Sequence, residues 1–168
     1  DGTLAAIEET IRGLGYAVDM IGNGRALCKR LVAGERWDLV FNICEGLKGR
    51  CREAQVPALL EMYDIPYTFS DPLVCAATLD KAVTKRLVRE AGLPTAKFAV
   101  ARKAEDARSI RLQFPLFAKP LAEGTGKGID SRSRIESQEQ LESVCRALLK
   151  NYAQPVLVEE YLPGEEFT

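Results

Sequence analysis

The sequence predicts an α/β protein made of two small units. Helical and strand-like patterns alternate along its 168 residues, and apolar residues make up 46% of the chain, enough to bury a core. The formal net charge is -1, so no global basic field would attract nucleic acid or an anionic membrane. Histidine is absent, which excludes Ser–His and Cys–His nucleophilic pairs. Because the net charge is close to zero, any phosphate site must depend on a local group of cations.

The first unit opens with a helical pattern. Apolar residues recur at helical spacing over 3–14, and Gly15 follows where a helix can end. We expect a short strand over 16–20, a helix from near Asn23, and a buried parallel strand over 37–42. An open α/β unit normally begins with a strand, so this one looks as if its opening strand were missing.

The middle of the chain predicts one more helix and a connection. The helix is expected over 53–62, where Pro57 is tolerated only in the first turn. An extended piece at 65–68 follows, because a residue before proline avoids the helical conformation, and then a turn at 70–72. A boundary between the two units is expected near Thr78.

The second unit begins with a clear helix over 80–90, which Thr78 could cap and Gly92 ends. Ser137 with Gln140 is a capping-box signature for a later helix. The remaining elements are three strands and two helices: strands over 98–101, 115–119 and 156–161, and helices over 104–112 and 137–149.

The stretch most indicative of chemistry is a strand that ends in Lys119 and continues into a glycine-rich loop. This loop contains Glu123, Gly124, Thr125, Gly126, Lys127 and Gly128. Glycines let backbone N–H groups approach a phosphate, and the lysines supply positive charge. The spacing is not that of a Walker A loop, and no helix follows directly as in a dinucleotide fingerprint. An ordinary hairpin with solvated lysines is the alternative.

Two flanking segments give this loop a context. Lys81 lies in the first turn of a helix, where the helix dipole disfavours a cation unless an anion is nearby; an exposed helix lysine is the alternative. Downstream, a strand ends in Glu159 and Glu160, and Glu166 follows a turn. Carboxylates at such positions can accept hydrogen bonds from an adenine amino group or ribose hydroxyls, although they could equally protect an edge strand.

Together these segments resemble the ATP-grasp fold and, within it, the D-alanine–D-alanine ligase family. The resemblance runs from Asp38 to Thr168 and includes Ile65-Pro66-Tyr67-Thr68, Leu79-Asp80-Lys81, Ala91-Gly92-Leu93-Pro94, the Lys119 strand with its loop, and Val156-Leu157-Val158-Glu159 with Gly164 and Glu166. It implies a Rossmann-like pre-ATP-grasp domain over 1–78, which holds the first substrate. It also implies the first α+β subdomain of an ATP-grasp fold over 79–168, with the second subdomain missing.

The resemblance also implies roles for individual residues. Lys81 and Lys119 match lysines that contact the nucleotide phosphates. The loop that closes over the phosphates contains Glu123, Gly124, Thr125 and Gly126, and Thr125, which matches a serine, is the catalytic candidate. The adenine would be held by Glu159, Glu160, Tyr161 and Leu162, and the ribose by Glu166.

Glu45 is a departure from the family's pattern. It stands where these ligases usually have the histidine of a His-Gly pair. This change reverses the charge at the first substrate's site and leaves the identity of that substrate open. Nearby, Arg50, Arg52 and Glu53 could bind a different carboxylate, or they could form a surface ion pair.

The implied activity is that of an ATP-dependent carboxylate–amine ligase, which forms a peptide-type bond through an acyl phosphate. ATP and Mg²⁺ would be required, with the magnesium ligands expected beyond residue 168, so we expect this chain alone to be inactive. The resemblance further implies amino-acid substrates, a homodimer, a cytoplasmic location and a role in peptidoglycan synthesis, without nucleic acid or membrane partners. Two alternatives stay open: a non-catalytic nucleotide-binding module, and an ATP-grasp ligase that acts on a different amino acid or peptide.

Overall fold

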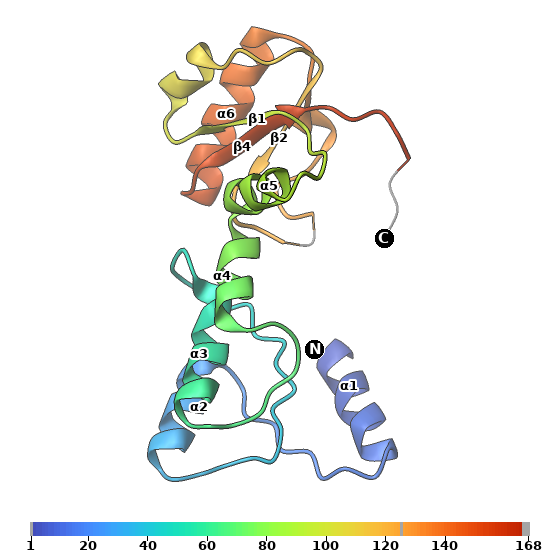
Figure 1. Ribbon diagram of the computed structural model, residues 1–168, viewed down its shortest axis with the longest axis vertical. Helices are drawn as coiled ribbons and strands as arrows, with labels where there is room; N and C mark the ends of the chain where they lie inside the picture. The colour runs from blue at the N-terminus through green and yellow to red at the C-terminus, as the bar shows by residue number, and fades with distance from the viewer. Residues whose placement is uncertain (1, 125, 166–168) are drawn as a thin grey trace.

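The computed structural model describes residues 2–124 and 126–165 and has two parts (Figure 1). One part contains helices and extended segments, and the other contains a sheet with its covering helices. Helix α4 (Pro72–Leu79) connects the two parts and leads directly into α5 (Lys81–Glu90). The candidate site lies where these parts meet, as described below.

Helices dominate the N-terminal part. It contains α1 (Gly2–Gly13), α2 (Gly24–Val32), the 3-10 helix η1 (Arg52–Ala54) and α3 (Gln55–Met62). Helix α2 begins near Asn23 as predicted, and Asn23 caps it, because its side chain accepts hydrogen bonds from two backbone N–H groups. Pro57 is the third residue of α3 and lies within its first turn, as predicted. Helix α1 stands apart in Figure 1 and has no buried residue.

The core of this part joins α2 to α3, but almost no sheet accompanies it. Its buried side chains are Leu27, Leu31, Val40, Val56, Leu60 and Ile65. The strand expected over 37–42 is reduced to one parallel bridge between Val40 and Tyr67, and residues 16–20 form no strand. A strand needs the N–H and C=O groups of a neighbour, which the described residues supply here only at that bridge.

The connection between the parts differs from the prediction. Residues 70–72 do not form an isolated turn, because Asp71 is the N-cap and Pro72 the first residue of α4. Asp-Pro suits a turn and a helix start equally well, since proline is favoured at the first helical position. Thr78 lies inside α4, and Asp80 caps α5 instead by accepting two backbone N–H groups.

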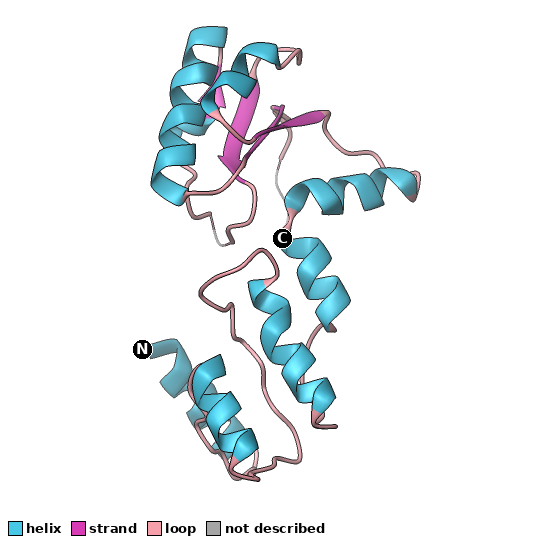
Figure 2. Ribbon diagram, turned by 90° about the vertical axis from the view of Figure 1, so that its left-hand side faces the viewer, coloured by secondary structure: helices cyan, strands magenta, loops and turns pink. Residues whose placement is uncertain are grey.

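The C-terminal part is a four-stranded antiparallel sheet. Its strands are β1 (Phe98–Ala101), β2 (Leu116–Pro120), β3 (Arg134–Ile135) and β4 (Val156–Glu160), in the order β1-β4-β2-β3. Helix α6 (Gln138–Tyr152) covers one face and α5 the other (Figure 2). Along the central strand β4, Val156 and Val158 join the core under α6, whereas Leu157 joins the core under α5. Burial on both faces accounts for its continuous apolar run.

Two details of this part were predicted differently. The helix expected over 104–112 is the shorter 3-10 helix η2 (Ala104–Ser109), and a second 3-10 helix, η3 (Ser131–Ser133), leads into β3. Strand β3 was not predicted, since two residues carry no recognisable period. Ser137 does cap α6, because its side chain accepts the N–H of Gln140 at 3.3 Å.

Strand register brings the key side chains together. Phe117 pairs with Glu159 and Lys119 pairs with Leu157 across β2 and β4. Lys119 and Glu159 are therefore diagonal neighbours on the same face, within reach for long side chains. A slip of one residue would place them on opposite faces.

Candidate functional site

A pocket of about 300 Å³ opens between the start of α5 and the loop that follows β2. Five of the predicted residues line it together: Lys81, Lys119, Glu123, Gly124 and Gly126. The other lining residues are Glu53, Thr78, Leu79, Pro120, Lys127 and Ile129. The fold thus gathers segments that lie far apart in the sequence around one cavity.

Lys81 is held by the loop itself. Its Nζ donates a hydrogen bond to the backbone carbonyl of Glu123, and its backbone N–H donates to the carbonyl of Leu121 at 3.2 Å. Burial, followed by the nearby Lys119 ammonium, lowers the pKa of Lys81. A half-buried cation beside another cation would be stabilised by a bound anion, so this lysine is suited to a phosphate.

Glu159 lies between two lysines. Its Oε1 is 2.7 Å from Lys119 Nζ, and its Oε2 is 2.7 Å from Lys85 Nζ. Burial alone would raise the pKa of Glu159, but the hydrogen bonds from Lys119 and Lys85 outweigh it, and the pKa lies below its ordinary value. Sequence analysis missed Lys85, although its four-residue spacing from Lys81 places both on one side of α5.

The glycine-rich loop is anchored at both ends. The Glu123 carboxylate accepts a hydrogen bond from Gln154 at 2.7 Å and pairs with Lys127 at 3.2 Å. At the far end Gly128 has φ +82°, and a Cβ there would lie 2.5 Å from Pro120 Cγ. Between these anchors, a Cβ at Gly124 or Gly126 would meet no atom of the described residues within 4 Å. Thr125, the catalytic candidate, lies outside the described residues, as does Glu166, the ribose candidate.

The segment predicted to hold adenine continues from β4. Glu160 donates its backbone N–H to the carbonyl of Lys97 at 3.0 Å and pairs with the Lys97 ammonium at 3.7 Å. The Tyr161 ring lies 6.4 Å from the ring of Phe117, centroid to centroid, and Leu162 is exposed. None of these predicted adenine-binding residues lines the pocket, and Glu159 is linked to it only through its ion pair with Lys119.

Glu45 is exposed and does not line the pocket. The loop that follows it is nevertheless linked, through Arg52, to the loop after β2. Gly46 has φ +68°, and a Cβ there would lie 2.5 Å from the carbonyl oxygen of Arg52. Arg52 Nη1 in turn donates to the carbonyl of Ala122 at 2.7 Å, so the first unit is bonded to the loop after β2.

Arg50 and Arg52 both have partners within the chain. Arg50 pairs with Asp80 at 2.9 Å, and Arg52 pairs with Glu53 at 3.3 Å. Burial alone would raise the pKa of Asp80, but the hydrogen bond from Arg50 and two backbone N–H groups lower it overall. These ion pairs favour the structural interpretation of the two arginines over a carboxylate-binding role.

Comparison with known proteins identifies the family. A family model described as the D-Ala-D-Ala ligase C-terminus matches residues 87–168. The D-alanine–D-alanine ligase of Pseudomonas entomophila is 36% identical over 166 residues, which cover 98% of this chain and 50% of that protein. The D-alanine–D-alanine ligase of Xylella fastidiosa is 33% identical over 165 residues, which cover 95% and 53% respectively. The chain belongs to the D-alanine–D-alanine ligase-like family of ATP-grasp proteins.

Solved structures support the fold of this ligase-like chain. The D-alanine–D-alanine ligase from Bacillus anthracis matches with a TM-score of 0.66 and 22% identity, over 82% of this chain and 44% of that one. The VanG D-Ala:D-Ser ligase from Enterococcus faecalis matches with a TM-score of 0.63 and 27% identity, over 76% and 37%. The ligase-like chain spans about half the length of the curated ligases it matches.

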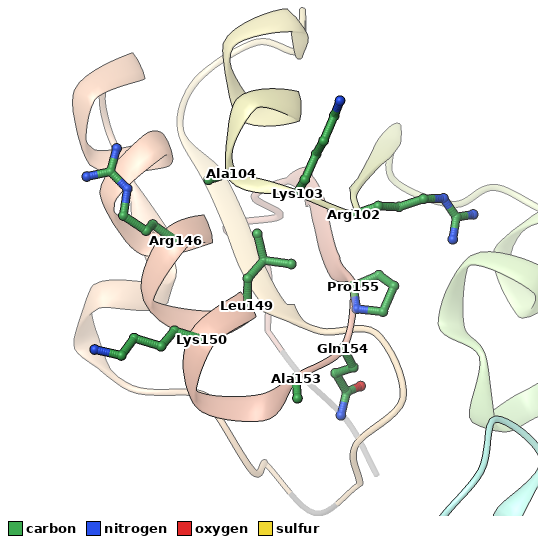
Figure 3. Close-up of a pocket in the computed structure, with 9 residues that line it drawn as sticks. All are labelled: Arg102, Lys103, Ala104, Arg146, Leu149, Lys150, Ala153, Gln154 and Pro155. Atoms are coloured by element: carbon green, nitrogen blue, oxygen red, sulfur yellow. The ribbon is translucent and has the colours of Figure 1, made fainter.

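A larger pocket of about 460 Å³ lies beside the C-terminal end of α6 and contains none of the predicted site residues (Figure 3). Its cations are Arg102, Lys103, Arg146 and Lys150. Figure 3 shows Arg146 and Lys150 extending to one side and Arg102 and Lys103 extending in other directions, so the four head groups do not converge on one ligand. Cations near the C-terminal end of a helix are explained by the helix dipole.

No three Cys, Asp or Glu side chains of the described residues form a group that could hold a metal ion. The pocket is lined by the cations Lys81, Lys119 and Lys127 and by part of the glycine-rich loop. In the part of the chain that the structure describes, no helix is long and apolar enough to cross a membrane.

Proposed function

We propose that this chain supplies the nucleotide-phosphate site of an ATP-dependent carboxylate–amine ligase. One observation carries the proposal: Lys81, Lys119 and the glycine-rich loop line a single pocket. Lys127 adds a third ammonium group to this pocket, and no atom of the described residues lies within 4 Å of the Cβ position of Gly124 or Gly126. Positive charge beside an open glycine loop is the arrangement that accepts phosphate oxygens.

The rest of the chain takes the following roles in this proposal. Residues 1–78 form a Rossmann-like pre-ATP-grasp domain that binds the first substrate, and residues 79–168 form the first ATP-grasp subdomain. The adenine is held by Glu159, Glu160, Tyr161 and Leu162, the ribose by Glu166, and Thr125 lies in the loop over the phosphates. The whole protein would be a cytoplasmic homodimer that uses ATP and magnesium to join amino acids. Its product would serve peptidoglycan synthesis.

The proposed reaction has two steps. First, the terminal phosphoryl group of ATP passes to the carboxylate of the first substrate, giving ADP and an acyl phosphate. An amine then attacks the acyl carbon and loses a proton, so a C–N bond forms as the bond to the departing phosphate breaks. Lys81 and Lys119 hold the phosphate oxygens and neutralise their charge, because phosphoryl transfer depends mainly on positioning and electrostatic stabilisation.

Isothermal titration with a non-hydrolysable ATP analogue and magnesium tests this proposal. The wild-type chain is expected to bind, and Lys119→Met to lose at least about tenfold in affinity, since it removes a phosphate-facing charge. Lys150→Met is the matched control, because this exposed lysine lies in the same part of the chain but outside the pocket. Equal binding by Lys119→Met and wild type, or no binding by wild type, would contradict the proposed site. Binding without acyl phosphate formation by the whole protein would favour a non-catalytic module.

We also propose that the first substrate differs from D-alanine. Glu45 carries the argument, because an acidic side chain would disfavour another carboxylate nearby and favour a cationic group. Substituting Glu45→His in the whole protein should change which amino acids or peptides support ADP release, while binding of the ATP analogue stays the same. An unchanged substrate profile would remove Glu45 from the substrate site.

A further inference from the structure

We propose that Lys85 is a positioning residue for the nucleotide site: it serves as the resident counter-ion of Glu159 and thereby leaves Lys119 available to bind phosphate. This inference rests on the proposed function, because it concerns the same pocket. Its structural half, that Lys85 controls the charge of Glu159, can be tested without any nucleotide.

Lys85 is held in place from three directions. Its Nζ lies 2.7 Å from Glu159 Oε2 on β4 and donates to Thr95 Oγ1 at 2.7 Å. The same Nζ lies 5.5 Å from the centroid of the Phe98 ring on β1. The side chain is only 14% exposed, and Lys85 does not line the pocket. Lys85 is thus placed to act on Glu159 and not to contact a ligand.

Glu159 is where this arrangement matters. Its side chain is 12% exposed, and each carboxylate oxygen accepts one lysine ammonium, Lys85 on one side and Lys119 on the other. A buried carboxylate without a counter-ion is costly. If Lys119 were the sole partner, it could turn toward a phosphate only by leaving Glu159 unpaired. Because Lys85 stays in place, Lys119 can turn to the nucleotide at a smaller electrostatic cost.

The two lysines that contact Glu159 differ in their access to the pocket. Lys119 lines the pocket and is 24% exposed, so it is the more accessible of the two cations that contact Glu159. Lys85 lies on the opposite side of the carboxylate, behind Thr95 and Phe98. One cation therefore faces the pocket, and the other is enclosed by the protein.

Titration of the intact chain with the ATP analogue tests the proposal through four proteins: wild type, Lys85→Met, Lys85→Arg and Arg86→Met. Lys85→Met keeps the aliphatic length and should weaken binding about tenfold, whereas Lys85→Arg should recover most of it because the charge returns. Arg86 is an exposed cation on the same helix, so Arg86→Met is the matched loss of one charge and should change affinity less than about twofold. Wild-type affinity in Lys85→Met, or an equal loss in Arg86→Met, would overturn the proposal.

A second measurement needs no nucleotide. The charged groups that face Glu159 are Lys119 from β2 and Lys85 from α5, and both lower its pKa. The carboxylate carbon of Glu159, followed by NMR against pH, should therefore titrate at a higher pH in Lys85→Met and at an unchanged pH in Arg86→Met. If wild type binds no nucleotide, the proposed function fails, and this titration still decides the role of Lys85. An unchanged midpoint in Lys85→Met would reject it.

Circular dichroism will show whether Lys85→Met folds. If it does not, Thr95→Val gives the decisive variant, because it removes the hydroxyl that accepts from Lys85 while keeping the side-chain shape. Because Lys85 would then be held less firmly, Thr95→Val should weaken analogue binding and raise the titration midpoint of Glu159. Both effects should be smaller than those expected for Lys85→Met. Neither change occurring in a folded Thr95→Val chain would overturn the proposal.

Discussion

The two parts of the molecule differ in how they use strand-like sequence. In the C-terminal part, β4 pairs along its length with β1 and β2, and its side chains are buried on both faces. In the N-terminal part, residues 37–42 have a comparable apolar pattern, yet they pair at Val40 alone, and Leu39 and Phe41 stay exposed. The difference teaches that an apolar run becomes a strand only when the fold supplies a neighbouring strand whose N–H and C=O groups can pair with its own.

The largest expected effect tests the core of the C-terminal part. Leu141 is fully buried between α6 and the sheet. Leu141→Ala should lower the free energy of unfolding by about 2–5 kcal/mol, the usual loss for a buried leucine that leaves a cavity. Urea denaturation followed by circular dichroism measures this loss. A loss below about 1 kcal/mol would show that the core around Leu141 is loosely packed.

The link between the parts gives the next effect. Arg52 Nη1 donates to the carbonyl of Ala122, and the Arg52 side chain is only 12% exposed. Arg52→Met should destabilise the chain by about 1–3 kcal/mol, because it leaves a carbonyl without its donor. It should also separate two unfolding transitions, which fluorescence of Trp37, the single tryptophan, and circular dichroism can distinguish. Arg25→Met, an exposed arginine on α2, is the control. Coincident, unshifted transitions in Arg52→Met would show that the bond does not couple the parts.

Acid should weaken the C-terminal part through its carboxylates. The pKa of Glu159 in the folded chain lies below its ordinary value of 4.5, so ionised Glu159 stabilises the fold above that pH. This stabilisation is lost as pH falls from about 4.5 through the lower folded pKa. Urea midpoints measured between neutral and acid pH should fall over that window, and less steeply in Glu159→Gln. An identical pH profile in Glu159→Gln would show that Glu159 does not contribute.

The smallest effect is expected in α1, which has no buried residue. Leu14, just beyond the helix, is 70% exposed. Leu14→Ala should change the free energy of unfolding by less than about 0.5 kcal/mol, as for other exposed positions.

Among the helices, amide hydrogen exchange should be fastest in α1, because local opening exposes no core. Strong protection of α1 would mean that this helix packs more firmly than its exposure indicates.

Local signals in the sequence account for much of the fold. The helix start near Asn23 and the cap at Ser137 were predicted and are present, since a side chain that satisfies a neighbouring N–H depends on few residues. Lys81, Lys119 and Gly124 were predicted to share a site, and they line one pocket. Their agreement follows from antiparallel register and from the helix start, both of which have recognisable patterns.

What the sequence did not reveal depends on contacts between distant segments. Nothing near Lys85 indicates that its ammonium would meet Glu159, because that contact arises only when α5 packs on β4. No sequence pattern predicts the hydrogen bond from Arg52 to the Ala122 carbonyl either, because a backbone acceptor does not depend on the type of side chain. Strand β3 is too short for its period to be seen.

The bond between Arg52 and Ala122 bears on how such proteins could exchange modules. Its acceptor is a main-chain carbonyl, so the side chain at position 122 can vary without removing the partner of the arginine. A hybrid joined within α4, with its first half from this chain and its second half from a relative, would keep the bond whichever amino acid the relative carries there. For this bond the one required side chain, Arg52, would travel with the first half, whereas the Arg50–Asp80 ion pair would also need an aspartate at position 80 of the second half.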